Sequence, residues 1–208
     1  LLGNESVRLA ICGAIDRGGR AGVLPEEQST TTDLVPETAS ERTLDYRDTA
    51  GHRTALTLTE AARTLFREGL AAEGEQKLPF TELLVPDTQT DRQAAGIIQG
   101  CWQNTLGASI NVMPLAVDEL WQRVYAGDYD MALLPLSDST AMGLLEDFAS
   151  DTDRYCTGWQ SEEYDALLDQ AAAETGAQAV RTLAQAEQLL RQSGVVLPPS
   201  TPMPHHAV

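Results

Sequence analysis

The sequence is poor in the residues from which catalytic and metal centres are most often built. Its 208 residues include three cysteines and three histidines. The cysteines Cys12, Cys101 and Cys156 are far apart and form no CxxC pair, which argues against a disulfide framework and against a structural zinc site. Two of the histidines, His205 and His206, lie in a proline-rich tail. A cysteine nucleophile paired with a nearby histidine is therefore disfavoured.

Motifs that mark nucleotide binding, hydrolysis or metal binding are also missing. There is no glycine-rich phosphate loop, no GxSxG elbow and no HExxH sequence. The triplet Asp151-Thr152-Asp153 resembles part of a calcium loop, but it lacks the glycine and the distal glutamate of such loops. We therefore expect no enzyme activity, no cofactor and no bound metal.

Basic residues and long apolar runs are scarce as well. The formal net charge is -17, with 31 acidic and 14 basic residues spread along the chain. This charge repels phosphate backbones, so nucleic-acid binding is disfavoured, and a solvated acidic surface is expected. No apolar run approaches the roughly 20 residues of a membrane helix, so no membrane span is expected. The chain begins without Met or a signal-like segment, which suggests a processed or shortened chain.

The middle of the sequence alternates apolar runs with helical patterns. Apolar runs at residues 83–85, 110–113 and 131–134 are separated by helical patterns at about 89–106 and 117–125. This order predicts a β-α-β-α-β unit whose short connections imply parallel neighbouring strands with right-handed crossovers.

The predicted sheet also indicates where a ligand would bind. Ligands of parallel sheets bind outside the carboxyl ends of the strands. The loop at residues 135–140 leaves the third apolar run and is therefore the first candidate for a binding site.

Helices are predicted on both sides of this unit. A first helix, capped by Asn4 or Ser6, runs to about residue 15, and a second begins near Thr59. Two more are predicted from Ser161 to about residue 172 and over residues 177–192.

Two further segments show little periodicity. Residues 22–53 are rich in Thr, Glu, Asp and Ser, and we expect them to form a long surface excursion. The tail at residues 198–208 contains four prolines within seven residues and is expected to be a departing linker.

Four short stretches, in this same order, carry a family resemblance. The first is VRLA followed by AIDR, at residues 7–17, and the second is ARTLFREG at 62–69. The third runs from IQ at 98–99 through LG at 106–107, Ile110 and Val112 to GDYD at 127–130. The fourth contains Tyr155, Gly158 and EYDALL at 163–168. Together they resemble the second lobe of the extracellular solute-binding proteins of peptide and nickel ABC importers (family 5, oligopeptide- and dipeptide-binding type).

The resemblance implies an α/β, periplasmic-binding-protein-like lobe spanning residues 1–208, with the central β-α-β-α-β unit flanked by helices. It implies a missing first lobe that completes the ligand cleft, and an ABC permease as partner. The ligand is expected to be a peptide or a similar small solute. The whole protein is expected outside the cytoplasm, lipid-anchored through an N-terminal part that this chain lacks.

The chain departs from the family at its expected ligand site. The family commonly has a WxxDYPDP-like stretch after the third strand, whose aspartate pairs with a peptide amino terminus. Here that place contains Ser137, Asp138 and Ser139, with no Trp and no Pro. Asp138 is the nearest candidate for the amine anchor, because a carboxylate facing an ammonium group in a closed cleft is favourable. A turn or helix-capping role is the alternative.

A second candidate segment contains Thr157, Gly158 and Trp159. Trp159 stands where the family often has Tyr. It is expected either to cover a pocket for a ligand side chain or to pack beneath the loop.

Two other functions are compatible with the sequence. The same fold serves as the ligand-sensing module of some transcriptional regulators, which an upstream DNA-binding domain in the parent gene would reveal. A small flavodoxin-like enzyme is the other alternative, but it requires a second reactive group beside Asp138, and the sequence shows none.

Overall fold

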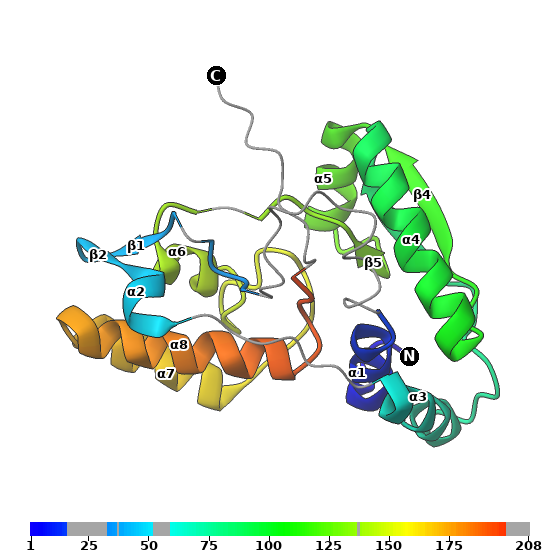
Figure 1. Ribbon diagram of the computed structural model, residues 1–208, viewed down its shortest axis with the longest axis horizontal. Helices are drawn as coiled ribbons and strands as arrows, with labels where there is room; N and C mark the ends of the chain where they lie inside the picture. Colours follow the sequence, from blue (N-terminus) through cyan, green and yellow to red (C-terminus); the bar gives the residue numbers. More distant parts are fainter. Residues whose placement is uncertain (16–32, 37, 52–58, 137, 199–208) are drawn as a thin grey trace.

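The computed structural model of the protein describes residues 1–15, 33–36, 38–51, 59–136 and 138–198 (Figure 1). Its sheet contains the strands β3 (Glu82–Pro86), β4 (Asn111–Leu115) and β5 (Met131–Ala132). The strand order is β4-β3-β5, and β3 pairs in parallel with both neighbours. The helices α4 (Gln89–Leu106) and α5 (Val117–Tyr125) connect the strands. The predicted parallel β-α-β-α-β unit is confirmed.

The central strand β3 separates two hydrophobic clusters. Successive side chains of a strand point to opposite faces of the sheet. Leu83 and Val85 accordingly belong to one cluster, whereas Leu84 belongs to the other. All three are 5% exposed or less, so both faces of β3 are covered.

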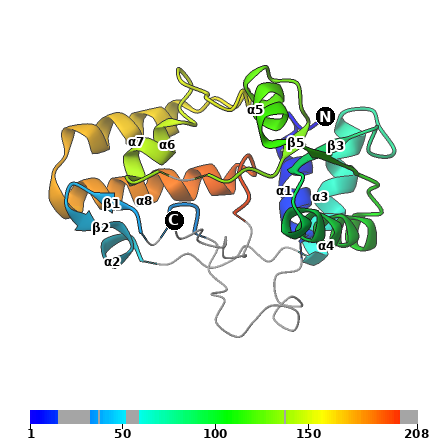
Figure 2. The ribbon, with the colours of Figure 1, turned by 90° about the horizontal axis from the view of Figure 1, so that it is seen from above.

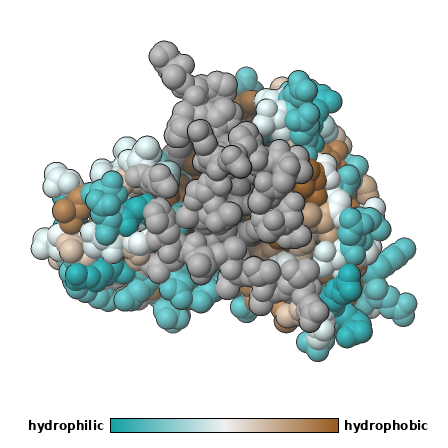
Figure 3. Space-filling view, viewed as in Figure 1, coloured by the Kyte–Doolittle hydropathy of each residue, from teal (hydrophilic) through white to brown (hydrophobic). Residues whose placement is uncertain are grey.

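The helices divide between these two clusters, and most of them lie in two groups at opposite ends of the molecule (Figures 1 and 2). One cluster lies among α1 (Glu5–Gly13), α3 (Thr59–Ala72) and α4. The other contains side chains of α5 and of the helices α6 (Ala141–Glu146), α7 (Glu162–Ala173) and α8 (Gly176–Gln192). Hydrophilic side chains cover much of the outer surface at the α7–α8 end (Figure 3).

The helix ends follow local sequence signals. Asn4, Thr88 and Ser161 are the N-caps of α1, α4 and α7, and each side chain accepts a hydrogen bond from a backbone amide of the first turn. Gly107 ends α4 with φ of 66°, a left-handed conformation that is common just after a helix. The α8 helix begins at Gly176, one residue earlier than expected.

The structure differs from expectation in the segment that we predicted to be a surface excursion, residues 22–53. Its described part, residues 33–36 and 38–51, contains the antiparallel pair β1 (Ser40–Glu41) and β2 (Leu44–Asp45), followed by α2 (Tyr46–Ala50). Val35 and Tyr46 have no exposed surface and lie in the same cluster as α8. The expectation of a surface position is therefore wrong for buried residues such as Val35, Tyr46 and Arg47, whereas others in this segment, such as Asp45 and Asp48, are exposed.

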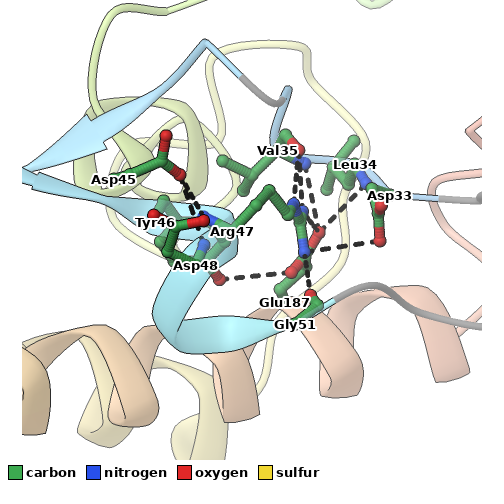
Figure 4. Close-up of polar contacts among 9 residues, drawn as sticks. All are labelled: Asp33, Leu34, Val35, Asp45, Tyr46, Arg47, Asp48, Gly51 and Glu187. Atoms are coloured by element: carbon green, nitrogen blue, oxygen red, sulfur yellow. Dashed lines mark hydrogen bonds and ion pairs between the residues drawn. The ribbon is translucent and has the colours of Figure 1, made fainter.

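A buried polar cluster explains how such a polar segment enters the core (Figure 4). Glu187 of α8 has no exposed surface, and its Oε1 accepts hydrogen bonds from the amides of Leu34 and Val35 at 3.0 and 3.1 Å. The same oxygen lies 2.5 Å from Nη2 of Arg47. Tyr46 donates its hydroxyl to Oε2 at 3.1 Å. Each buried polar group thus gains a partner in place of water.

Arg47 completes this cluster. Its Nε and Nη2 donate to the carbonyl of Val35 at 3.0 and 2.7 Å, and its Nη1 lies 3.3 Å from the carboxylate of Asp33. The cluster joins residues 33–51 to α8, which is more than a hundred residues away in sequence.

None of the helices in the described ranges is both long enough and apolar enough to cross a membrane. Of the tail that we predicted to be a linker, residues 199–208 lie outside the described residues.

Candidate functional site

The loop after β5 places Asp138 in a tight turn. Its Oδ1 accepts hydrogen bonds from the amide and the hydroxyl of Thr140, at 2.8 and 3.1 Å. Thr140 in turn caps α6, because its hydroxyl accepts the amide of Gly143 at 3.0 Å. Asp138 therefore takes part in a turn, while Thr140 rather than Asp138 caps α6, and the side chain of Asp138 is also exposed. Ser137 lies outside the described residues.

Gly143 determines how closely the Asp138 carboxylate approaches α6. A Cβ atom at position 143 would lie 2.9 Å from Cγ and from both carboxylate oxygens of Asp138. Any side chain there would displace the carboxylate. The sequence analysis missed this residue, since a glycine within a short apolar helix carries no signal of its own.

The strand β1 supports the same loop. The amide of Ser40 donates to the carbonyl of Ser139 at 3.0 Å, and Ser40 forms a parallel bridge with Thr140. The buried carboxylate of Glu41 accepts the amide of Met142 at 3.1 Å. Ser139 is thereby held through its backbone, while its side chain remains exposed.

The second candidate segment is organised by Asp153. One carboxylate oxygen accepts the amide and hydroxyl of Thr157 at 2.8 and 2.9 Å, and the other accepts the amide of Gly158 at 2.9 Å. Asp153, Cys156 and Gly158 all have positive φ, at 27°, 52° and 68°. The loop is thus wound tightly around Asp153, which the sequence analysis considered only as part of a calcium-like triplet.

Trp159 packs on the core beneath this loop. Its ring lies 5.1 Å from that of Tyr164, edge to face at 64°, and it contacts the cluster that contains α7. Of the two roles expected for Trp159, packing is the one observed. Its side chain is only half-buried, so part of it still faces solvent.

Two tyrosine hydroxyls form hydrogen bonds that tie the loop at 153–159, which includes Tyr155, to the rest of the protein. Tyr129 donates its hydroxyl to the carbonyl of Tyr155 at 2.6 Å, and Tyr155 donates to Asp147 at 2.9 Å. Burial, followed by the nearby Asp153 and Cys156, raises the pKa of Tyr129 to about 12. Burial and the hydrogen bond to Asp147 also raise the pKa of Tyr155.

Alkaline pH is expected to destabilise the protein through Tyr129. Unfolded Tyr129 loses its proton near its ordinary pKa of 10, whereas the folded group retains it to about 12. The unfolded state therefore binds fewer protons in this window, and the free energy of unfolding falls as the pH rises from 10 to 12. Urea unfolding across this range measures the slope. The slope should be shallower in Tyr129→Phe, and equal slopes would contradict the assignment.

The two candidate segments share one core, but no polar contact joins them. Leu136 and Trp159 both pack against the cluster that contains α6 and α7. Between residues 138–140 and 153–159, all of which are described, there is no hydrogen bond or ion pair. Within the described ranges, no group of three or more His, Cys, Asp or Glu side chains is placed to hold a metal ion.

Comparison with known proteins identifies the fold. No protein-family model matches the sequence. The chain is 24% identical over 205 residues to the dipeptide-binding protein DppE of Bacillus subtilis, and the match covers 94% of this chain and 37% of that protein.

Solved structures give the same result. The peptide-bound OppA of Listeria monocytogenes matches with a TM-score of 0.76 and 20% identity, over 93% of this chain and 38% of that one. The substrate-binding domain of an oligopeptide ABC transporter of Bacillus anthracis matches with a TM-score of 0.78 and 21% identity, over 95% and 40%.

One further structure has nearly the extent of this chain. It is a peptide-binding protein of a peptide ABC transporter, with a TM-score of 0.73, 21% identity and coverage of 95% of this chain and 90% of that one. The chain therefore has the fold of one part of a peptide-binding protein, and the predicted resemblance and α/β fold class are confirmed.

Proposed function

We propose that the chain is one lobe of an extracytoplasmic solute-binding protein that captures peptides for an ABC importer. The observation that carries this proposal is the fold match over more than nine-tenths of the chain to proteins described as binding peptides. Because the chain spans 37% of DppE, the remaining cleft wall belongs to sequence outside this chain. Binding then proceeds by closure of two lobes around the ligand, and the closed form docks on the permease.

The placement of the loop at 135–140 supports a role in this cleft. It follows β5, at the carboxyl edge of the parallel sheet, where ligands of such sheets bind. Asp138 uses one carboxylate oxygen within its own turn. The other oxygen forms no hydrogen bond with a described residue, so an exposed acceptor is available for a peptide ammonium group.

The second loop contributes differently from Asp138. The amides of Thr157 and Gly158 already donate hydrogen bonds to Asp153. We therefore propose that these two residues contribute carbonyl acceptors and the shape of the binding surface, not hydrogen-bond donors. Trp159 offers the exposed part of its ring to a ligand side chain, and Ser137 and Ser139 offer hydroxyl groups. Contacts of this kind tolerate varied side chains, as a peptide importer requires.

We infer binding rather than catalysis, with no cofactor, because the proteins that the chain resembles are binding proteins. The permease, the missing lobe and a lipid anchor belong to the same proposal. A regulator's sensing module or a small enzyme has no specific observation in its favour.

The amine-anchor role of Asp138 can be tested in the whole two-lobed protein. Asp138→Asn is expected to weaken binding of peptides with a free amino terminus by about 10- to 100-fold, because a charge-assisted hydrogen bond is lost. Asparagine keeps an oxygen for the bonds to Thr140, so the turn should survive. Isothermal titration with a peptide library measures the affinities.

Two controls accompany this experiment. N-acetylated peptides should bind Asp138→Asn and the parent protein equally, and Asp169→Asn, an exposed change on α7, should leave all affinities unchanged. Unchanged affinity of Asp138→Asn for free-amine peptides would remove Asp138 from the site. Failure of every peptide to bind the parent protein would overturn the proposed function itself.

A further inference from the structure

A groove lies between the carboxyl-terminal ends of α3 and α4. Its volume is about 540 Å³, within the range of sites that hold a peptide side chain or a small ligand. Phe66, Leu70, Leu78 and Leu106 form its apolar lining.

This groove lies away from the candidate ligand loop. The helix α4 starts after the carboxyl end of β3 and returns to the amino end of β4, so its last residues lie at the amino edge of the sheet. The loop at 135–140 leaves the opposite, carboxyl edge. Figures 1 and 2 show α3 and α4 at the end of the molecule far from α7 and α8. The groove therefore does not belong to the proposed peptide cleft.

The charge of the groove is opposite to that of the chain. Arg63, Arg67 and Lys77 line it, against one carboxylate, Glu75, although the chain as a whole carries a net charge of -17. Arg63 donates to the carbonyl of Thr105 at 2.7 Å. The groove is thus a local cationic site on an acidic protein.

Two of these cations have no partner within the described structure. Arg67 and Lys77 are exposed and form no hydrogen bond or ion pair with any described residue. Every other arginine in the described ranges has at least one polar, ionic or ring partner. The chain has about twice as many acidic as basic residues. Arg67 and Lys77 nevertheless have no described partner, so both can pair with an anionic group of another molecule.

An exposed aromatic side chain follows the groove-lining residues in the sequence. Phe80 follows the lining residue Leu78 by two positions and is 78% exposed, more than any other large hydrophobic side chain in the described residues. Aromatic anchors beside apolar grooves are typical of binding surfaces. The groove thus combines an apolar floor with two available cations, and an exposed ring lies two residues beyond its lining in the sequence.

We propose that this groove docks a short acidic segment of a partner protein that carries at least one large apolar side chain. The apolar side chain enters the space lined by Phe66, Leu70 and Leu106, and the carboxylates of the segment pair with Arg67 and Lys77. Charge complementarity favours a partner segment with negative charge and increases its rate of association. The concave shape favours a protein segment over a flat anionic membrane.

The test uses the full chain and two synthetic probes, a short amphipathic peptide of glutamate, leucine and phenylalanine and its counterpart with lysine for glutamate. The acidic peptide is expected to bind and to shift the amide NMR signals of residues 66–80 and 105–107. Binding should weaken at high salt and by about tenfold in Arg67→Glu. Phe80→Ser should also weaken it.

Arg181→Glu is the matched control, because it makes the same charge change at an exposed site on α8 and should alter affinity less than about twofold. Equal losses in Arg67→Glu and Arg181→Glu would overturn the proposal, as would the absence of binding or signal shifts confined to residues 138–159. Binding of phosphatidylglycerol vesicles, but not of the peptide, with the same dependence on Arg67 would assign the groove to a membrane instead. Signal shifts confined to residues 138–159 would point to the proposed cleft, whereas the other outcomes do not bear on peptide capture there.

Discussion

Replacing Glu187 with alanine is expected to lower the free energy of unfolding by about 3–5 kcal/mol, because it removes one member of a buried ion pair. Arg47, which is 5% exposed, would lose the closer of its two counter-charges and keep only Asp33, whose carboxylate lies 3.3 Å from Nη1. The amides of Leu34 and Val35 and the hydroxyl of Tyr46 would lose their acceptor in the same step. All of these interactions involve the Glu187 carboxylate, so a single substitution removes them together and its effect on stability is large.

Urea unfolding followed by circular dichroism measures this change. The matched control is Gln188→Ala, the next residue of α8, whose side chain is exposed; it should change stability by less than about 0.5 kcal/mol. The loss of stability in Glu187→Gln should lie between those of Glu187→Ala and Gln188→Ala, because glutamine keeps an acceptor oxygen but not the charge. A loss for Glu187→Ala no larger than that of the control would mean that the cluster does not hold residues 33–51 to α8.

The same cluster has a consequence for the candidate site. Residues 33–51 carry β1, which holds the backbone of Ser139 and the start of α6. In Glu187→Gln, hydrogen exchange should therefore quicken first at the amides of Leu34 and Val35, and then at that of Ser40, which donates to Ser139. The loop at 138–140 thus depends on a core group that no ligand touches.

Leu84→Ala is expected to lower the free energy of unfolding by about 2–5 kcal/mol, the usual range for truncating a fully buried leucine. Leu84 has no exposed surface and lies in the middle of the central strand, where β3 pairs with β4 and β5. Its side chain fills the cluster that also contains α5 to α8. Neighbouring strands fix the backbone on both sides, so the cavity has little freedom to collapse.

The same unfolding measurement tests this change against Ile97→Ala. Ile97 is 41% exposed on α4, so its truncation removes less buried surface and should cost less than about 1 kcal/mol. If the two variants lost similar stability, Leu84 would not occupy the densely packed position that the structure gives it.

Much of this fold could be predicted from local sequence patterns. The three apolar runs became strands of one parallel sheet, and the residue pair Leu84 and Val85 shows the expected alternation between its faces. Gly107 ends α4 in a left-handed conformation, which glycine adopts without a steric penalty. Periodicity and capping act within a few residues, so the sequence displays them directly.

The candidate site could be predicted only in outline. The loop after β5 follows from strand order alone, but the role of Asp138 depends on Thr140 and on the space left by Gly143. The conformation of the loop at 153–159 depends on Asp153, whose carboxylate accepts hydrogen bonds from amides that could otherwise donate to a ligand. Both arrangements require the backbone to turn in a particular way, which composition does not specify.

By itself, the sequence determined the parallel unit, the helices around it and the position of the candidate loop at the carboxyl edge of the sheet, because each follows from periodicity and strand order. Only the tertiary structure decided the place of residues 33–51. Their polar composition predicts solvent exposure when it is considered alone. It becomes compatible with burial only when Glu187, from a helix at the other end of the chain, supplies the charge and the acceptor atoms that water would otherwise provide.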